Sequence, residues 1–207
     1  MTWHRRKGRV LTEEAYEAAG GLYGAVARTA ERVFSRLTPG QAEVARRILL
    51  RLIAPGEGTQ DTRRPVTRAE LGADGPGDVA TVLERLARAR LITLDHDTVD
   101  LAHEALITAW PRLRGWIDTD RERLRTHRRL TEAAQAWHGL VRDPGALHRG
   151  ARLDIAEEAF AAPGRGRELT VLEEEFLAAS VAARADERRA AVRITRRLRS
   201  LVAGLSA

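Results

Sequence analysis

The sequence of 207 residues contains no cysteine and a single lysine, Lys7. Without cysteine, disulfides and thiolate metal sites are excluded, and a reducing compartment is permitted. Aromatic residues make up only 4% of the chain, so the core has to be built from alanine, leucine, valine and isoleucine. No apolar run approaches the roughly 20 residues that a membrane helix needs, and none follows the basic N-terminal residues as in a signal peptide. We therefore expect a cytoplasmic protein.

The sequence also lacks the motifs of common active sites. It has no G-x-x-x-x-G-K-[ST] loop, whose backbone amides and lysine hold nucleotide phosphates. The six histidines show no spacing with carboxylates that is typical of a metal site. The four serines lie in helical or terminal contexts, so a Ser/His/Asp triad is not expected. We predict no catalytic residue, no metal site, and no enzyme activity for this chain.

The net charge is +6 and comes almost wholly from arginine. Acidic residues alternate with the arginines over most of the length. This favours solvated helix faces over a continuous nucleic-acid-binding stripe. The exception is the segment from 184 to 199, which contains seven arginines and only two acidic residues. It reads either as a solvated helix or as a basic segment that precedes a membrane helix.

A compact unit is predicted over residues 38–103. Thr38, Pro39 and Gln41 form a helix start with a capping box, and the helix is expected to run to about Ala54. A second capping box at 67–70 opens a short helix, and a third helix covers about 78–89. Residues 91–94 and 99–101 read as two strands joined by a turn. Three helices closed by a β-hairpin predict a winged-helix unit.

The rest of the chain reads as helix. Upstream, helices are expected from Thr12 to Gly20 and over 22–37. Downstream, the helix bends or restarts after Trp110-Pro111 and continues over 112–141, with five residues on its buried face, Leu124, Leu130, Ala134, Trp137 and Leu140. Further helices start at Asp143-Pro144 and at a capping box over 170–173. The predicted fold class is therefore mainly α, with the winged-helix unit followed by an α-helical connector.

Two kinds of candidate site emerge. His103 lies where the second strand becomes helix; it reads either as a half-buried structural histidine or as a contact to a phosphate or effector at a domain junction. The third helix would be the DNA-recognition helix of a transcriptional regulator, with Arg85, Arg88 and Arg90 as contacts. Glu84 and the acidic turn that includes Asp95 would face phosphate unfavourably, which argues against DNA.

Several long motifs occur in one order along nearly the whole chain: Tyr16-Glu-Ala-Ala-Gly-Gly, Gly56-Glu-Gly-Thr-Gln-Asp-Thr-Arg-Arg, Ala102-His-Glu-Ala-Leu-Ile, Ala109-Trp-Pro-Arg-Leu-Arg-Gly-Trp and Leu147-His-Arg-Gly-Ala-Arg-Leu. In these motifs the chain resembles the novel STAND NTPase family of actinobacteria. That family combines a P-loop NTPase core, a helical lid, a winged helix, a helical stretch, often a membrane helix, and a WD-repeat propeller.

The resemblance implies a division of the chain into four parts. Residues 1–37 would be the end of the lid, 38–103 the winged helix, 104–183 the helical connector and 184–207 an Arg-rich helical tail. The NTPase core, membrane helix and propeller are expected to lie outside this sequence, so membrane contact would need a further segment.

The resemblance also implies a role. STAND proteins are signalling switches, and a winged-helix histidine senses the phosphate of bound nucleotide in relatives; His103 matches that position. We expect a non-catalytic regulatory fragment, without its own cofactor, that responds to ATP or ADP held by the family's core. Its partners would be the core or other protein domains, within an oligomer in the intact protein. We expect core or interface positions for Arg63, Arg64, Trp110, Trp116 and Trp137, and core positions for the three tryptophans among them. A gene remnant without function is a further alternative.

Overall fold

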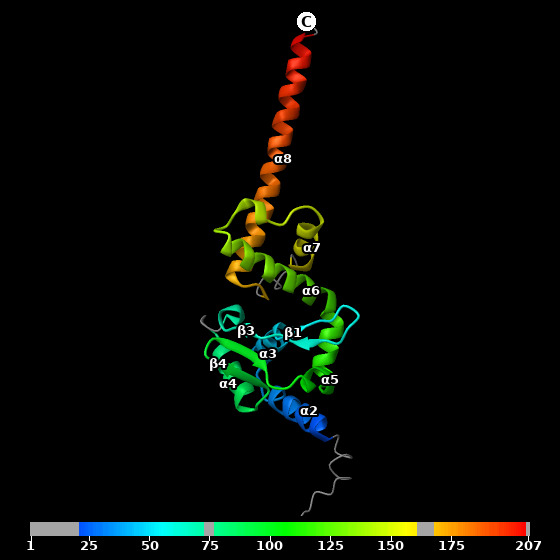
Figure 1. Ribbon diagram of the computed structural model, residues 1–207, viewed down its shortest axis with the longest axis vertical. Coiled ribbons are helices and arrows are strands. Elements are labelled where there is room, and N and C mark those ends of the chain that lie inside the picture. Colours follow the sequence, from blue (N-terminus) through cyan, green and yellow to red (C-terminus); the bar gives the residue numbers. More distant parts are fainter. Residues whose placement is uncertain (1–20, 73–76, 161–167, 206–207) are drawn as a thin grey trace, which may run out of the picture. The chain divides into compact units, whose positions relative to one another are not determined.

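The computed structural model describes residues 21–72, 77–160 and 168–205 (Figure 1). Within these ranges the protein is mainly helical, as the sequence predicts. It divides into two compact units, residues 1–119 and 120–207. The predicted helix from Thr12 to Gly20 lies outside the described residues. No helix in the described ranges combines the length and apolar character that crossing a membrane requires.

The described part of the first unit begins with two helices, α2 (Gly21–Phe34) and α3 (Pro39–Arg51). The predicted capping box of α3 is confirmed: Thr38 Oγ1 accepts from the Gln41 amide at 3.3 Å, and Gln41 Oε1 accepts from the Thr38 amide at 3.4 Å. This helix ends three residues earlier than expected. The backbone leaves the helix at Leu52 because Ile53 and Ala54 form strand β1 (Ile53–Ala54), which pairs with β2 (Thr62–Arg63).

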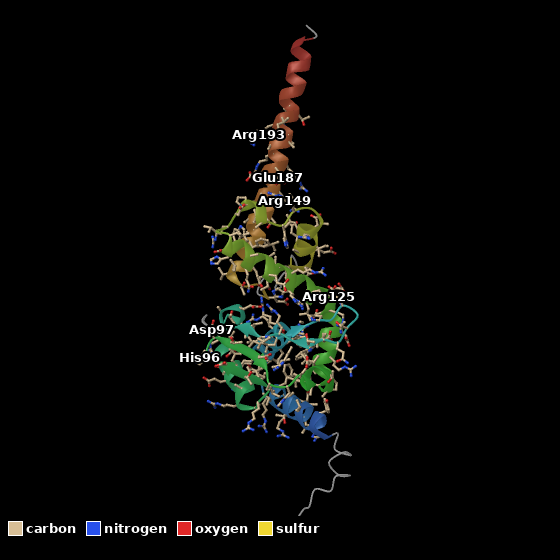
Figure 2. The ribbon with its side chains drawn as sticks, viewed as in Figure 1. His96, Asp97, Arg125, Arg149, Glu187 and Arg193 are labelled. Atoms are coloured by element: carbon tan, nitrogen blue, oxygen red, sulfur yellow. The ribbon has the colours of Figure 1, made fainter. Side chains whose placement is uncertain are left out.

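A second, three-stranded sheet has the order β3-β5-β4 and is antiparallel. Its strands are β3 (Val66–Thr67), β4 (Ile92–Asp95) and β5 (Thr98–Leu101). The predicted hairpin is confirmed, with His96 and Asp97 at its turn (Figure 2). The 3-10 helix η1 (Ala69–Leu71) and helix α4 (Val79–Arg88) lie between β3 and β4 in the chain. The apolar residues of α3, α4 and this sheet are buried together, with Ile48, Val82, Val99 and Leu101 fully buried.

The chain leaves β5 through two further helices, α5 (Ala105–Ala109) and α6 (Pro111–Gly139). The predicted break at Trp110-Pro111 is confirmed, because Trp110 is extended, with φ −93° and ψ 106°. Proline fits the first position of α6, where its missing N–H costs nothing. In Figure 1, α5 lies beside α2, and the two helices are in contact.

The second unit consists of the rest of α6, the 3-10 helix η2 (Pro144–Ala146), and helices α7 (Ala151–Phe160) and α8 (Val171–Leu205). The helix predicted at Asp143-Pro144 is only the three residues of η2. The capping box at the start of α8 is confirmed, with Thr170 Oγ1 and the Glu173 amide 3.2 Å apart. Among the described residues of the second unit, a buried apolar core is formed by Leu130, Ala134, Trp137, Ala156, Phe160 and Phe176.

One prediction about the core, that of Leu140, is wrong. Leu140 is 59% exposed, because α6 ends at Gly139 and the backbone turns away from the helical path there. Val141 and Arg142 both have positive φ, of 54° and 64°. The other four predicted residues of the α6 face, from Leu124 to Trp137, are buried as expected.

The predicted divisions at 37/38, 103/104 and 183/184 stay predictions. The first compact unit continues through α5 and the start of α6 to Thr119, and α8 passes position 184 without interruption.

Candidate functional site: the junction of β5, α5 and α2

His103 lies between the end of β5 and the start of α5, as predicted from the sequence. Its side chain is exposed, whereas Leu101 before it and Leu106 after it are buried. The His103 carbonyl accepts a hydrogen bond from the Leu106 amide at 3.0 Å, which begins the helical turn. Among the described residues, no side chain hydrogen-bonds or ion-pairs with the imidazole. The His103 side chain therefore combines exposure with two ring nitrogens that can donate or accept a hydrogen bond.

The other end of α5 is fixed to α2 through Trp110. The indole of Trp110 is 2% exposed, and its Nε1–H donates to Glu31 Oε2 at 2.8 Å. Arg112 donates to the same carboxylate from Nε at 3.1 Å and from Nη2 at 2.5 Å. One glutamate of α2 therefore receives hydrogen bonds from both sides of the α5–α6 break.

Aromatic packing surrounds this carboxylate. Phe34 of α2 packs against Trp110 and Trp116, with ring centroids 5.9 Å and 5.1 Å away. The guanidinium of Arg112 lies over the Phe34 ring at 4.9 Å, within the range of a cation–π interaction. Trp116 is half-buried rather than fully in the core. We call this group the α2 anchor, and its members are Glu31, Phe34, Trp110, Arg112 and Trp116.

The α2 anchor explains the spacing of the motif Trp110-Pro-Arg112-Leu-Arg-Gly-Trp116. The extended Trp110 directs its indole to α2, and Pro111 starts a new helix. Arg112 and Trp116 are four residues apart, so they lie on the same face of α6. The sequence identified the α5–α6 half of the anchor. It did not identify Glu31 as its partner, since Glu31 precedes Trp110 by 79 residues and α2 carries no local signal for this contact.

Because the α2 anchor contains the carboxylate of Glu31, the stability of the first unit depends on pH. Hydrogen bonds from Arg112, and then from Trp110, hold the pKa of Glu31 below its usual range. The folded pKa is lower than the unfolded one of about 4.3, so this stabilisation is present above that pH. It is lost as the pH falls through the folded pKa.

We expect Glu31→Gln to remove the part of the stability that is lost as the pH falls. The wild-type and variant proteins should differ most in their free energy of unfolding near neutral pH and converge at acid pH. Because the Arg112–Glu31 pair is nearly half exposed, the difference should be at most about 1 kcal/mol. Urea unfolding across the acid range measures it, and parallel curves for the two proteins would contradict the assignment.

The two arginines singled out beside β3 have different surroundings. Arg63 is half exposed and pairs with Asp100 of β5 at 3.1 Å. Arg64 pairs with the buried Glu70 at 2.8 Å, and Arg51 reaches the same carboxylate oxygen at 3.4 Å. Arg64 therefore belongs to a buried ion-pair cluster that joins the β2–β3 segment to η1 and α3.

The three arginines predicted for DNA contact are all exposed on or just after α4. Arg85 donates to Gln41 of α3 at 3.0 Å, and Arg88 pairs with Glu84 at 3.3 Å. The hairpin turn beside this helix presents Asp95 and Asp97, both exposed. This arrangement gives the DNA-binding alternative no specific support, because the turn carries negative charge and would repel phosphate.

The model of the novel STAND NTPase 1 family matches residues 1–145. No curated protein and no solved structure was found to match. The family match identifies residues 1–145 as a STAND NTPase-associated region. The chain belongs to the novel STAND NTPase 1 family, and the matched residues include His103 and every member of the α2 anchor.

Proposed function

We propose that this chain is the non-catalytic, regulatory part of a STAND-type P-loop ATPase, and that it couples nucleotide state to partner contacts. The observation that carries the proposal is the arrangement of α5. An exposed histidine lies at its first turn, and the buried Trp110 at its other end is bonded to Glu31 of α2. Because the chain belongs to an NTPase family, ATP or ADP is the ligand to which such an arrangement would respond.

We interpret residues 38–103 as a winged helix within this scheme. The order of elements supports it: α3, β3, η1, α4 and then the β4–β5 hairpin, with β3 paired to β5. Winged helices serve as protein-contact units as well as DNA-binding units, so the fold itself does not decide between them. The acidic hairpin turn favours protein contacts.

The proposed signal begins at His103. Phosphate is an acceptor of hydrogen bonds, and an imidazole donates one without requiring a permanent charge. The 207 residues carry no P-loop, so ATP or ADP would be held by a P-loop domain and presented to His103. A ligand shifts a conformational equilibrium only by its different affinity for the two states. The presence or absence of one phosphate contact at His103 would provide that difference.

The proposed signal continues through α5 to α2. Helix α5 has five residues and is about 8 Å long, so little more than one helical turn lies between His103 and Trp110. Displacement of its first turn toward a phosphate would move Trp110, and with it the hydrogen bond to Glu31. Helix α2 would then change its position or its stability. In the intact protein α2 would belong to the end of the lid, so this contact would transmit nucleotide state to the lid.

The test compares two histidines of the same unit. We expect addition of the wild-type chain to change the ADP affinity of a P-loop domain from the same family by about tenfold, a usual size for coupling between sites. His103→Ala should abolish this change. His96→Ala is the matched control, because His96 is exposed at the hairpin turn and its ring contacts its neighbour Asp95.

Isothermal titration of ADP into the mixed domains gives the affinity for each variant. The proposal is wrong if His103→Ala and His96→Ala leave the same ADP affinity. If the two variants abolish the change in ADP affinity equally, the effect does not arise at α5, and the proposal is wrong in that case as well.

A further inference from the structure

Helix α8 has two parts with different surroundings. Its first part packs in the core of the second unit, where Phe176 is fully buried and Ser180 is 1% exposed. From Asp186 to Arg196 every residue is exposed except Ala190, which is half-buried. Figure 1 shows this part of α8, in orange to red, continuing beyond α7. An unpacked helix of this length is only marginally stable in water, so a partner that covers it would stabilise it.

The acidic residues of this segment are already paired. Glu187 accepts from Arg149 at 3.1 Å, and Figure 2 shows these two residues beside each other. Asp186 pairs with Arg189 at 2.5 Å. No acidic residue follows Glu187 in the sequence, whereas six arginines do. The segment from 188 onward therefore carries strong positive charge, and Arg193 projects from it farther along the helix in Figure 2.

The arginines are confined to one side of the helix. With 3.6 residues per turn, successive positions are rotated by about 100°. On this spacing Arg188, Arg189, Arg193 and Arg196 fall within one half of the circumference, and the sequence adds Arg197 and Arg199 to that half. The opposite half begins with Ala190, Ala191 and Ile194, and the sequence continues it with Leu198, Leu201 and Leu205. Ile194 is 59% exposed, and Val192, the one large apolar residue on the basic half, is 51% exposed.

We propose that residues 188–205 of α8 bind the surface of an anionic lipid bilayer. The arginines would contact lipid phosphates, and the half that contains Ile194 would face the acyl chains. A helix with a basic half and an apolar half is suited to lie in the membrane interface, and anionic lipids attract clustered arginines. Within residues 188–205 the basic half fits the membrane surface, because a segment inside the bilayer would be apolar on all sides.

Two other partners fit the segment less well. A second copy of the helix would pair through positions 191, 194, 198, 201 and 205, which follow the heptad spacing. Such a pairing would bury the apolar half but would bring no acidic partner to the arginines, because no acidic residue follows Glu187 in the sequence. Nucleic acid would satisfy the arginines but would leave the apolar half exposed.

The experiment is flotation of the full chain with vesicles. We expect binding to vesicles of phosphatidylcholine mixed with phosphatidylglycerol and none to phosphatidylcholine alone. Arg193→Glu with Arg196→Glu should weaken binding by at least about tenfold. Arg88→Glu with Arg90→Glu changes the net charge equally at exposed sites in the first unit and should bind like the wild type. Ile194→Asp should also weaken binding, and added salt should reduce binding of the wild type.

Hydrogen exchange on the vesicles should show added protection only in α8 after Glu187. Absence of binding to anionic vesicles would overturn the proposal, as would equal loss in the two double variants. Equal binding to neutral vesicles would overturn the role of the arginines, and unchanged binding of Ile194→Asp would overturn that of the apolar half. Dimerisation by light scattering, or duplex DNA binding, without vesicle binding would identify one of the other partners and overturn the proposal.

Discussion

Trp110→Ala should destabilise the first unit by about 3–5 kcal/mol, the usual range for truncating a large buried aromatic residue. The substitution removes a ring that is 2% exposed, its packing on Phe34, and the hydrogen bond to Glu31. It should also loosen α2, because Trp110 contacts both Glu31 and Phe34 of that helix. Urea unfolding measures the loss of stability, and hydrogen exchange over residues 21–34 measures the loosening of α2.

Thr108→Ala is the control for this prediction. Thr108 is exposed on α5, and its hydroxyl donates to the Ala105 carbonyl of the same turn at 3.3 Å. The change should leave the stability within about 0.5 kcal/mol, as for most surface substitutions. If α2 amides in Trp110→Ala remained as protected as in the wild type, the α2 anchor would not hold α2 as described.

Phe176→Ala should have an effect of similar size in the second unit, about 3–5 kcal/mol. Phe176 is fully buried on α8 and packs edge-on against Trp137 at 5.7 Å and His148 at 4.9 Å. Its loss leaves a cavity between α6 and α8. Urea unfolding followed by tryptophan fluorescence should show an earlier transition, because the emission of Trp137 reports on this core.

Val171→Ala is the matched control for Phe176→Ala. Val171 is on the same helix but is 73% exposed, so its truncation should change the free energy of unfolding by less than about 0.5 kcal/mol. A loss below about 1 kcal/mol in Phe176→Ala would mean that the core relaxes around the missing ring or that α8 does not pack as described.

The parts of the fold that depend on local sequence were predicted well. Capping boxes at Thr38 and Thr170 start α3 and α8 because the partner groups are three residues apart. The β4–β5 hairpin follows from two short alternating strands, and the break at Pro111 follows from a single residue. Each of these signals is complete within a few neighbouring positions.

The parts that depend on distant partners were not predicted. The end of α3 is set by the pairing of Ile53 with Arg63 across a loop. The capping box at 67–70 forms only in part: Thr67 Oγ1 accepts from the Glu70 amide, while the Glu70 carboxylate is bonded to Arg51 and Arg64. Sequence spacing could not show which of these competing donors the carboxylate would bind.

The candidate site divides in the same way. The position of His103 between strand and helix, and the importance of Trp110, followed from the local pattern. The partner of Trp110 did not, because Glu31 is one of many glutamates on helical surfaces and has no distinguishing neighbour. Only the tertiary structure brings its carboxylate to Trp110 and Arg112.

The central claim is that the nucleotide is bound elsewhere and that this chain responds to it. The most direct measurement is a titration of labelled ATP and ADP against the chain alone, against a P-loop domain of the family, and against the mixture. We expect no saturable binding by the chain alone and different ADP affinities for the P-loop domain and the mixture. Tight nucleotide binding by the chain alone, or identical curves for the P-loop domain with and without it, would contradict the account.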